Sequence, residues 1–175
     1  GCFWCLEHDL EEINGIIDAE SGYSGGKLIN PNYQKHDGHQ ESVKVVFDNA
    51  IIEYKDLLRA YWRNIDPFDG QGQFCDRGDS YRPVIFPFTE SQKREAIKSV
   101  EHASNELNKS LKDLKVEIKE STSFWIAEDY HQDFAINNSF KYNFYRYSCG
   151  RDARLDSVWG SKARSSDSWT PEPQT

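Results

Sequence analysis

Gly1-Cys2-Phe3-Trp4-Cys5-Leu6-Glu7 is the stretch that decides how the rest of the chain is interpreted, because its two cysteines at CxxC spacing enclose two large aromatic residues. Beyond it, Leu10 and Ile13 continue the apolar spacing while acidic residues fall on the other side. This pattern predicts an amphipathic helix that starts near Cys2 and ends at Asn14-Gly15. A thiol in the first turn of a helix lies near unpaired backbone N–H groups and the positive end of the helix dipole, and both favour the thiolate. We therefore expect Cys2 to be a nucleophile, with Cys5 one turn further along the same face.

The same residues also allow a purely structural interpretation. Free cysteines are often small buried hydrophobic residues, and a Phe-Trp pair can simply fill a core. A CxxC motif alone does not decide between this interpretation and a reactive thiol pair.

Composition narrows the classes of function. A chain of 175 residues suits a single domain. The net charge of −8, the pI near 5.1 and the absence of any Lys/Arg run argue against a nucleic-acid partner. No apolar stretch approaches the roughly 20 residues that span a bilayer, so we expect no membrane association. Four cysteines at uneven spacing fit neither a secreted disulfide framework nor a paired-knuckle zinc site, which leaves redox chemistry as their better use.

Predicted strands and helices alternate along the chain without a strict βαβ repeat. Strands are expected at 16–23, 41–48, 83–88 and 116–120, and helices at 53–65, 90–111 and 124–134. Long polar loops at 24–40 and 69–82 are of the kind that carries function. We therefore expect an α+β two-layer sandwich with a mixed sheet over residues 1–160, followed by a flexible tail over 161–175.

Several motifs follow the opening stretch in a fixed order. They are Gly22-Tyr23-Ser24-Gly25-Gly26, Asn30-Pro31-Asn32-Tyr33, Gly38-His39-Gln40-Glu41, Asp76 through Tyr81-Arg82, and Ala127-Glu128-Asp129-Tyr130-His131-Gln132. Together with the opening stretch they resemble peptide methionine sulfoxide reductase A over roughly residues 1–150. The resemblance implies that family's ferredoxin-like sandwich and the thiol-dependent reduction of methionine-S-sulfoxide, free or in proteins, to methionine, without a cofactor or a metal.

Carried over by motif position, the family's roles make Cys2 the nucleophile, Glu41 the proton donor, and Phe3 and Trp4 the walls of a pocket for the substrate methyl group. A further set, Tyr33, Tyr81 and Asp76, would complete a polar wall. The chemistry needs these residue types, because a sulfoxide oxygen leaves readily only when it is protonated and held by hydrogen-bond donors. His39 stays outside this set, since a thiolate at a helix start needs no base and a lone loop histidine is more often structural.

The resemblance further implies that Cys2 becomes a sulfenic acid, that a second thiol converts it to a disulfide, and that thioredoxin reduces that disulfide. Helix geometry alone places Cys5 within disulfide reach of Cys2. Cys149 is the alternative, because Gly150 and the polar stretch beyond could let it swing toward Cys2 and some relatives use a C-terminal cysteine. We expect Cys5 to resolve the sulfenic acid.

Two departures from the family pattern stand out. Relatives usually have a short strand running into the Gly-Cys-Phe-Trp turn; since this chain begins at Gly1, we expect a preceding segment outside the sequence and part of the sheet left unpaired. Phe134 stands where many relatives have tyrosine, so one hydrogen bond to the sulfoxide is expected to be absent.

Two other classes of function remain open. The first is a general CxxC thiol–disulfide oxidoreductase, which the bulky Phe-Trp pair between the cysteines and the lack of an obvious cis-proline segment disfavour. The second is a zinc-binding module that uses Cys2, Cys5, Cys75 and Cys149, which the spacing disfavours. For the reductase we expect a cytoplasmic monomer.

Overall fold

The structure is a computed structural model that describes residues 1–120 and 123–169. Its helices and strands are α1 (Phe3–Glu11), β1 (Ile16–Ser24), β2 (Gln40–Phe47), α2 (Tyr54–Trp62), β3 (Gly72–Gln73), β4 (Asp76–Arg77), β5 (Val84–Ile85), α3 (Glu90–Leu107), β6 (Glu117–Ile118), β7 (Trp125–Ile126), α4 (Phe134–Asn137), α5 (Ser139–Ser148) and α6 (Arg151–Trp159). The mixture of helices with parallel and antiparallel strands confirms the predicted α+β class.

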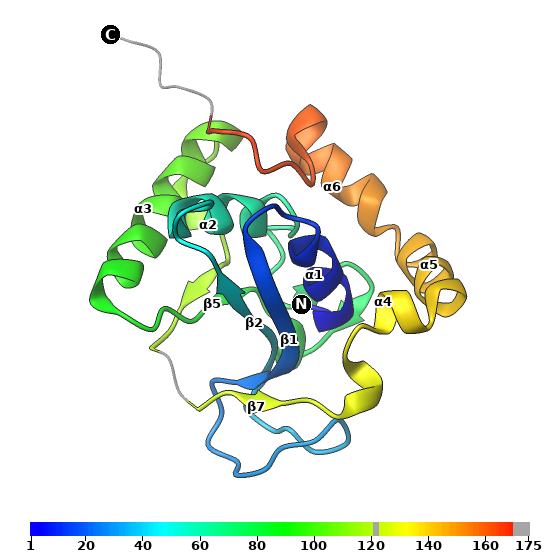
Figure 1. Cartoon of the computed structure of the whole chain (residues 1–175). Coiled ribbons are helices and arrows are strands. Elements are labelled where there is room, and N and C mark those ends of the chain that lie inside the picture. Colours follow the sequence, from blue (N-terminus) through cyan, green and yellow to red (C-terminus); the bar gives the residue numbers. More distant parts are fainter. Residues whose placement is uncertain (121–122, 170–175) are drawn as a thin grey trace, which may run out of the picture.

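A long antiparallel pair, β1 and β2, forms the centre of the molecule, and α1 packs against it (Figure 1). β7 pairs with the other edge of β1, giving the strand order β2-β1-β7. The buried carboxylate of Glu7 on α1 accepts a hydrogen bond from the backbone N–H of Ser21 on β1 at 3.2 Å, and burial raises the pKa of Glu7 to about 7. This bond fixes the start of α1, with its two cysteines, over the sheet.

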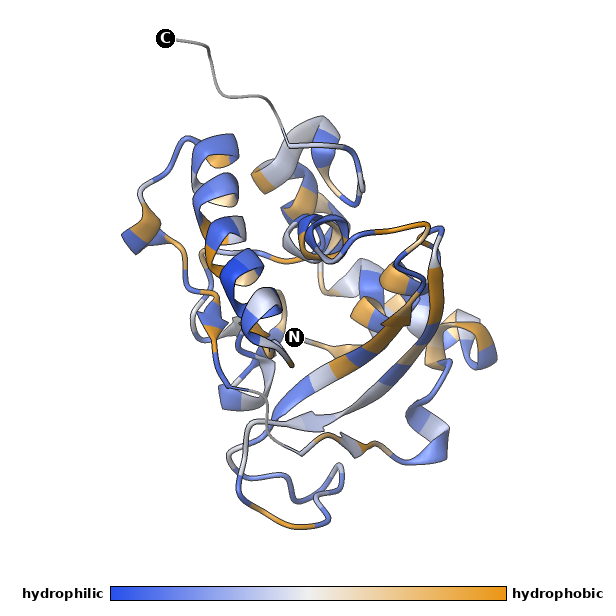
Figure 2. Cartoon of the chain, turned by 60° about the vertical axis from the view of Figure 1, so that its left-hand side comes forward, coloured by the Kyte–Doolittle hydropathy of each residue, from blue (hydrophilic) through white to orange (hydrophobic). Residues whose placement is uncertain are grey.

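The second half of the core lies among the helices. Trp62 of α2 is fully buried with Leu155 and Trp159 of α6, and its indole N–H donates to Ser99 of α3 at 2.9 Å. Thr89 begins α3 by accepting a hydrogen bond from Gln92 N–H. The ribbon of α3 is mostly hydrophilic, as expected for an exposed flank (Figure 2).

The second edge of β2 is open. The backbone groups of Ser21 on β1 bond to β7 and Gln132, so they point away from β2. Successive residues of an antiparallel strand point their backbone groups to opposite sides. On β2, Ser42 therefore points its N–H and C=O toward β1, whereas Val43 and Val45 point theirs to the other side, away from β1. Facing this edge across a gap is β5, which pairs in parallel with β6 in a separate sheet. Among the described residues β2 pairs with no strand other than β1; that a further strand belongs at this edge stays a prediction.

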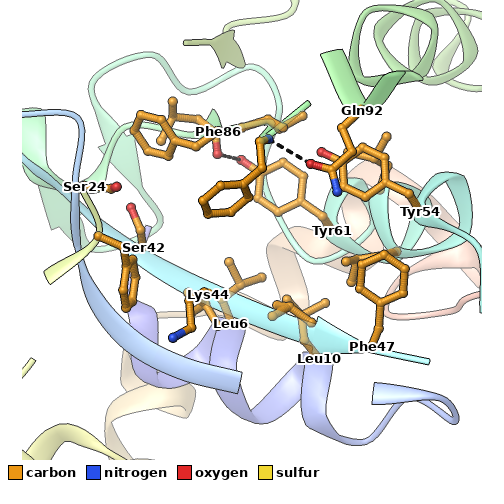
Figure 3. Close-up of a pocket in the computed structure, with 18 of the residues that line it drawn as sticks. Leu6, Leu10, Ser24, Ser42, Lys44, Phe47, Tyr54, Tyr61, Phe86 and Gln92 are labelled. Atoms are coloured by element: carbon orange, nitrogen blue, oxygen red, sulfur yellow. Dashed lines mark hydrogen bonds between the residues drawn. The ribbon is translucent and has the colours of Figure 1, made fainter. Parts of the chain in front are cut away.

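Between β2 and β5 lies an apolar groove with a cavity of about 150 Å³. Leu6 and Leu10 of α1, Phe47 of β2, and Tyr54 and Tyr61 of α2 turn their side chains into it (Figure 3). Gly1 and Glu41 border the groove, whereas neither Cys2 nor Cys5 does. The groove is therefore a separate feature from the thiol pair.

One element prediction was wrong and two strands are shorter than expected. The stretch 124–134 is not a helix: Trp125–Ile126 forms β7, because the Phe124 ring covers Gly22 and the backbone pairs with β1. The strands expected at 83–88 and 116–120 are only Val84–Ile85 and Glu117–Ile118. None of the helices in residues 1–120 and 123–169 combines the length and apolar character that a bilayer crossing requires.

The predicted tail, 161–175, falls partly on described residues. The guanidinium groups of Arg59 on α2 and of Arg63 directly after α2 donate to backbone carbonyls of Ser166 and Asp167, and Trp169 lies over Arg63. Residues 170–175 lie outside the described part, so a flexible end remains a prediction for them.

Candidate active site

The thiol pair sits at the start of α1. Cys2 is the residue that caps the helix, and its carbonyl accepts the N–H of Leu6, as expected for a helix that begins there. The side chains of Cys2 and Cys5 are 5% and 1% exposed and pack against Ala135 and Tyr142. Both are free thiols. The structure therefore brings the two cysteines together in a dry environment.

The pKa values of the two thiols shift in opposite directions. The pKa of Cys2 is raised well above its ordinary value, first because burial disfavours the thiolate and then because of its hydrogen bond with Cys5. The pKa of Cys5 is lowered to about 7, first by the hydrogen bond from Cys2 and then by the nearby guanidinium of Arg151. Both directions run against the expectation that the helix start favours a thiolate on Cys2, and they favour keeping the shared proton on Cys2 rather than on Cys5.

Glu41 lies close to this pair. It is on β2, only 4% exposed, and its carboxyl accepts the backbone N–H of Phe3 at 3.2 Å. Burial raises the pKa of Glu41 to about 7, although the Phe3 N–H acts in the opposite direction. A carboxylic acid with this pKa keeps a large share of its proton near neutral pH, which a general acid requires.

An aromatic wall stands beside the thiols. Phe3 is fully buried, so Trp4 forms the accessible part of this wall. The Trp4 indole stacks on Phe134, with ring centroids 3.8 Å apart, and its N–H donates to Nδ1 of His131 at 3.0 Å. Burial lowers the pKa of His131, which keeps that nitrogen free to accept. Trp4 is therefore held on both sides.

The predicted polar wall comes from two loops. Tyr33, in the loop between β1 and β2, is 40% exposed, and its backbone N–H donates to Glu128. Tyr81 ends a short 3₁₀ helix, Asp79–Tyr81, and hydrogen-bonds Tyr33. Burial raises the pKa of both tyrosines, with the Glu41 carboxylate adding to the effect, so both remain hydroxyl donors.

His39 holds the first of these loops in place. The ring is buried, its Nδ1 accepts the N–H of Gly26 at 3.2 Å and its Nε2 lies 3.0 Å from the carbonyl oxygen of Leu28. A Cβ at Gly26 would approach this ring within 2.3 Å. The structural interpretation of His39 is confirmed.

Asp76, on β4, reaches the same region through a residue that the sequence reasoning missed. The hydroxyl of Tyr145 on α5 donates a short hydrogen bond to the Asp76 carboxylate. Tyr145 also packs against the cluster that contains Cys2 and lies edge-on to Trp4, with ring centroids 5.9 Å apart. The sequence showed only a dense aromatic run at 142–147. The three-residue spacing of Tyr142 and Tyr145, which puts both on one helical face, was the available signal.

The other two cysteines, Cys75 and Cys149, form a disulfide with Cα atoms 4.9 Å apart. It joins the β3–β4 hairpin to the end of α5. Because these sulfurs are bonded to each other, the zinc alternative lacks two of its four thiolate ligands in this state. Cys149 could accept a bond from Cys2 only after its bond to Cys75 opened.

Comparisons with known proteins agree with this arrangement. The family model described as peptide methionine sulfoxide reductase matches residues 1–163. The peptide methionine sulfoxide reductase MsrA 2 of Caulobacter vibrioides is 47% identical over 164 residues, covering 91% of this chain and 82% of the relative. The MsrA of Listeria monocytogenes is 41% identical over 163 residues, covering 91% of this chain and 92% of the relative.

Solved structures of methionine sulfoxide reductases are also similar to this chain. The methionine sulfoxide reductase A of Corynebacterium diphtheriae is similar with a TM-score of 0.72 at 27% identity, covering 79% of this chain and 72% of that one. Reduced Mxr1 of Saccharomyces cerevisiae has a TM-score of 0.72 at 25% identity, covering 79% of this chain and 82% of that one. The chain belongs to the peptide methionine sulfoxide reductase family, and its reaction is the reduction of methionine sulfoxide.

Proposed function

We propose that Cys2 performs this reduction by attacking the sulfoxide sulfur while Glu41 protonates the sulfoxide oxygen. The observation that carries the proposal is the buried Glu41 carboxyl, bonded to the N–H of the residue that follows Cys2. The Cys2 proton passes to the Cys5 thiolate to which it is hydrogen-bonded. The hydroxyl derived from the sulfoxide passes to Cys2, which becomes a sulfenic acid, and methionine leaves with the electron pair.

The surrounding residues orient the substrate in this proposal. Tyr33 and Tyr81 donate hydrogen bonds to the oxygen as it gains negative charge. Trp4, held flat against Phe134, receives the methyl group, and Phe3 supports Trp4 from below. A fixed aromatic wall lowers the entropy that must be lost to align sulfur, oxygen and thiol.

Cys5 then resolves the sulfenic acid. Its sulfur attacks Cys2, a Cys2–Cys5 disulfide forms, and water leaves with the proton that Cys5 had received. An external dithiol, which we take to be thioredoxin, returns both cysteines to thiols by thiol–disulfide exchange.

The test is a coupled assay with NADPH, thioredoxin reductase and thioredoxin on separated epimers of methionine sulfoxide. We expect turnover of the S epimer alone, since each epimer has its own class of reductase. Cys2→Ser is expected to be inactive. Equal turnover of both epimers, or activity in Cys2→Ser, would refute the assignment.

We also propose the finer fold and setting that the resemblance implies, a two-layer sandwich in a cytoplasmic monomer. The apolar lining of the groove between β2 and β5 suits one extended strand, which would join the antiparallel and parallel pairs into one mixed sheet. A version of the chain extended before Gly1 should then melt at a higher temperature. An unchanged melting temperature would count against the mixed sheet.

A further inference from the structure

The Cys2 sulfur must become an anion in surroundings that disfavour one. It is buried against Ala135 and Tyr142, and the groups whose charges reach it include Glu41, Cys5, Tyr145, Arg151, the Gly1 amino group and the hydroxyls of Tyr33 and Tyr81. Cys5 can take the Cys2 proton, but it then offers no charge compensation to the attacking sulfur. A donor aimed at that sulfur would lower the barrier, because a hydrogen bond to a charged group is stronger than one to a neutral group.

Tyr145 is placed to be that donor. Its hydroxyl contacts Cys2 on one side and the Asp76 carboxylate on the other. A phenol carries one proton, so it can serve only one of these acceptors at a time. With Cys2 in the thiol form the proton is directed to Asp76; once Cys2 loses its proton, the sulfur is a second anion within reach of the same hydroxyl.

The position of the hydroxyl is well fixed. The Tyr145 ring packs edge-on against Trp4, and the Trp4 face is already covered by Phe134. Asp76, on the β3–β4 hairpin, accepts the hydrogen bond from this hydroxyl. The disulfide between Cys75, which precedes Asp76, and Cys149 joins the hairpin to the end of α5. The N–H of Cys149 in turn donates to the carbonyl of Tyr145. Two elements distant in sequence are thus locked together at this hydroxyl.

We propose that Tyr145 is a catalytic residue: its hydroxyl, held beside Cys2 by Asp76, turns its proton to the Cys2 sulfur as that sulfur becomes the attacking thiolate. Tyr145 neither gains nor loses an atom in this step: the Cys2 proton goes to Cys5, and the Tyr145 hydroxyl changes its hydrogen-bond acceptor from Asp76 to the Cys2 sulfur. The inference rests on Cys2 being the nucleophile.

The test is the pH dependence of Cys2 alkylation by iodoacetamide without substrate, with modification located by fragmentation mass spectrometry. Tyr145→Phe keeps the ring and removes the donor, so we expect the midpoint for Cys2 to move upward by about one pH unit or more, and single-turnover sulfenic acid formation to slow about ten- to a hundredfold. Tyr147→Phe is the matched control on the same helix, because Tyr147 is 86% exposed; it should behave as the unaltered protein does.

A second variant guards against a folding defect. Replacing Tyr145 with 3-fluorotyrosine keeps the shape and makes the phenol a stronger donor, so the Cys2 midpoint should move downward. If Tyr145→Phe leaves both the midpoint and the rate unchanged, or if the fluorinated protein shifts in the same direction as Tyr145→Phe, the inference is overturned. Loss of activity in Cys2→Ser would stand in either case, which separates this outcome from a failure of the nucleophile assignment.

Discussion

Glu41 shows how one residue's environment determines its chemistry. In water a glutamic acid is ionised near neutral pH, but on β2 its carboxyl is buried and its pKa is raised to about 7. The acid form is the one that donates a proton, so the rate of sulfenic acid formation should fall as the pH rises through about 7.

Glu41→Gln is expected to remove this fall in rate with rising pH. Gln keeps the shape and the acceptor for the Phe3 N–H but has no proton to donate, so the chemical step should slow by about 10²–10⁴. Single-turnover measurements between pH 5.5 and 8.5 would check both effects. If the variant keeps both the rate and its fall above pH 7, another group is the proton donor.

At this scale the sequence predicted identities better than protonation states. Cys2, Cys5, Glu41 and Asp76 do lie around one cluster, and the motif order was enough to name them. The reversed acidity of the two thiols was not predictable, because it depends on burial by α4 and α5 and on Arg151 of α6. Those contacts join residues more than a hundred positions apart.

At the scale of elements, the junction of β1 and β7 depends on one glycine. A Cβ at Gly22 would lie 2.3 Å from the Phe124 ring and 2.4 Å from the carbonyl oxygen of Trp125. Gly22→Ala should therefore destabilise the fold by about 1–3 kcal/mol through overpacking. Urea unfolding would measure this. Gly70→Ala is the control, since its Cβ would meet only the Lys115 side chain at 3.3 Å; equal midpoints for the two variants would contradict the packing argument.

The Cys75–Cys149 disulfide is a second junction between elements. It closes a loop across a sequence separation of 74 residues and should stabilise the fold by about 2–4 kcal/mol. Cys75→Ser with Cys149→Ser, made in a Cys2→Ser, Cys5→Ser protein so that no other thiol takes part, should lower the free energy of unfolding by that amount relative to its parent. An unchanged urea midpoint under non-reducing conditions would show that the bond does not form or does not contribute.

The same junctions explain where element prediction failed. Residues 124–134 have aromatic and apolar spacing that suits a helix, and only the exposed edge of β1 and the bare surface of Gly22 make part of this stretch a strand. Helices α1, α2 and α3 were predictable because each carries its own periodicity and terminating residues. A two-residue strand such as β7 has no such local signal.

For the whole molecule, the sequence predicted the α+β class. It did not predict the path of the last residues. Arg63, the residue after α2, is fully buried; it pairs with Glu106 and donates to the carbonyls of Asp167 and Ser168. A buried guanidinium needs such acceptors, but nothing in a stretch rich in Ser and Asp indicates that it supplies them.

The whole-molecule arrangement also decides how the catalytic cycle closes. Cys149 is already bonded to Cys75, whereas Cys5 lies free beside Cys2. The chain therefore holds two separate cysteine pairs, and the account requires that only one of them changes in a turnover.

The most direct test is disulfide mapping after a single turnover. Protein with Cys2 and Cys5 reduced is treated with one equivalent of methionine-S-sulfoxide in the absence of reductant, free thiols are blocked, and the peptides are analysed by mass spectrometry. We predict one equivalent of methionine, a new Cys2–Cys5 bond and an unchanged Cys75–Cys149 bond. A dominant bond from Cys2 to Cys149 or Cys75, or methionine formed with Cys2 still a free thiol, would contradict the account.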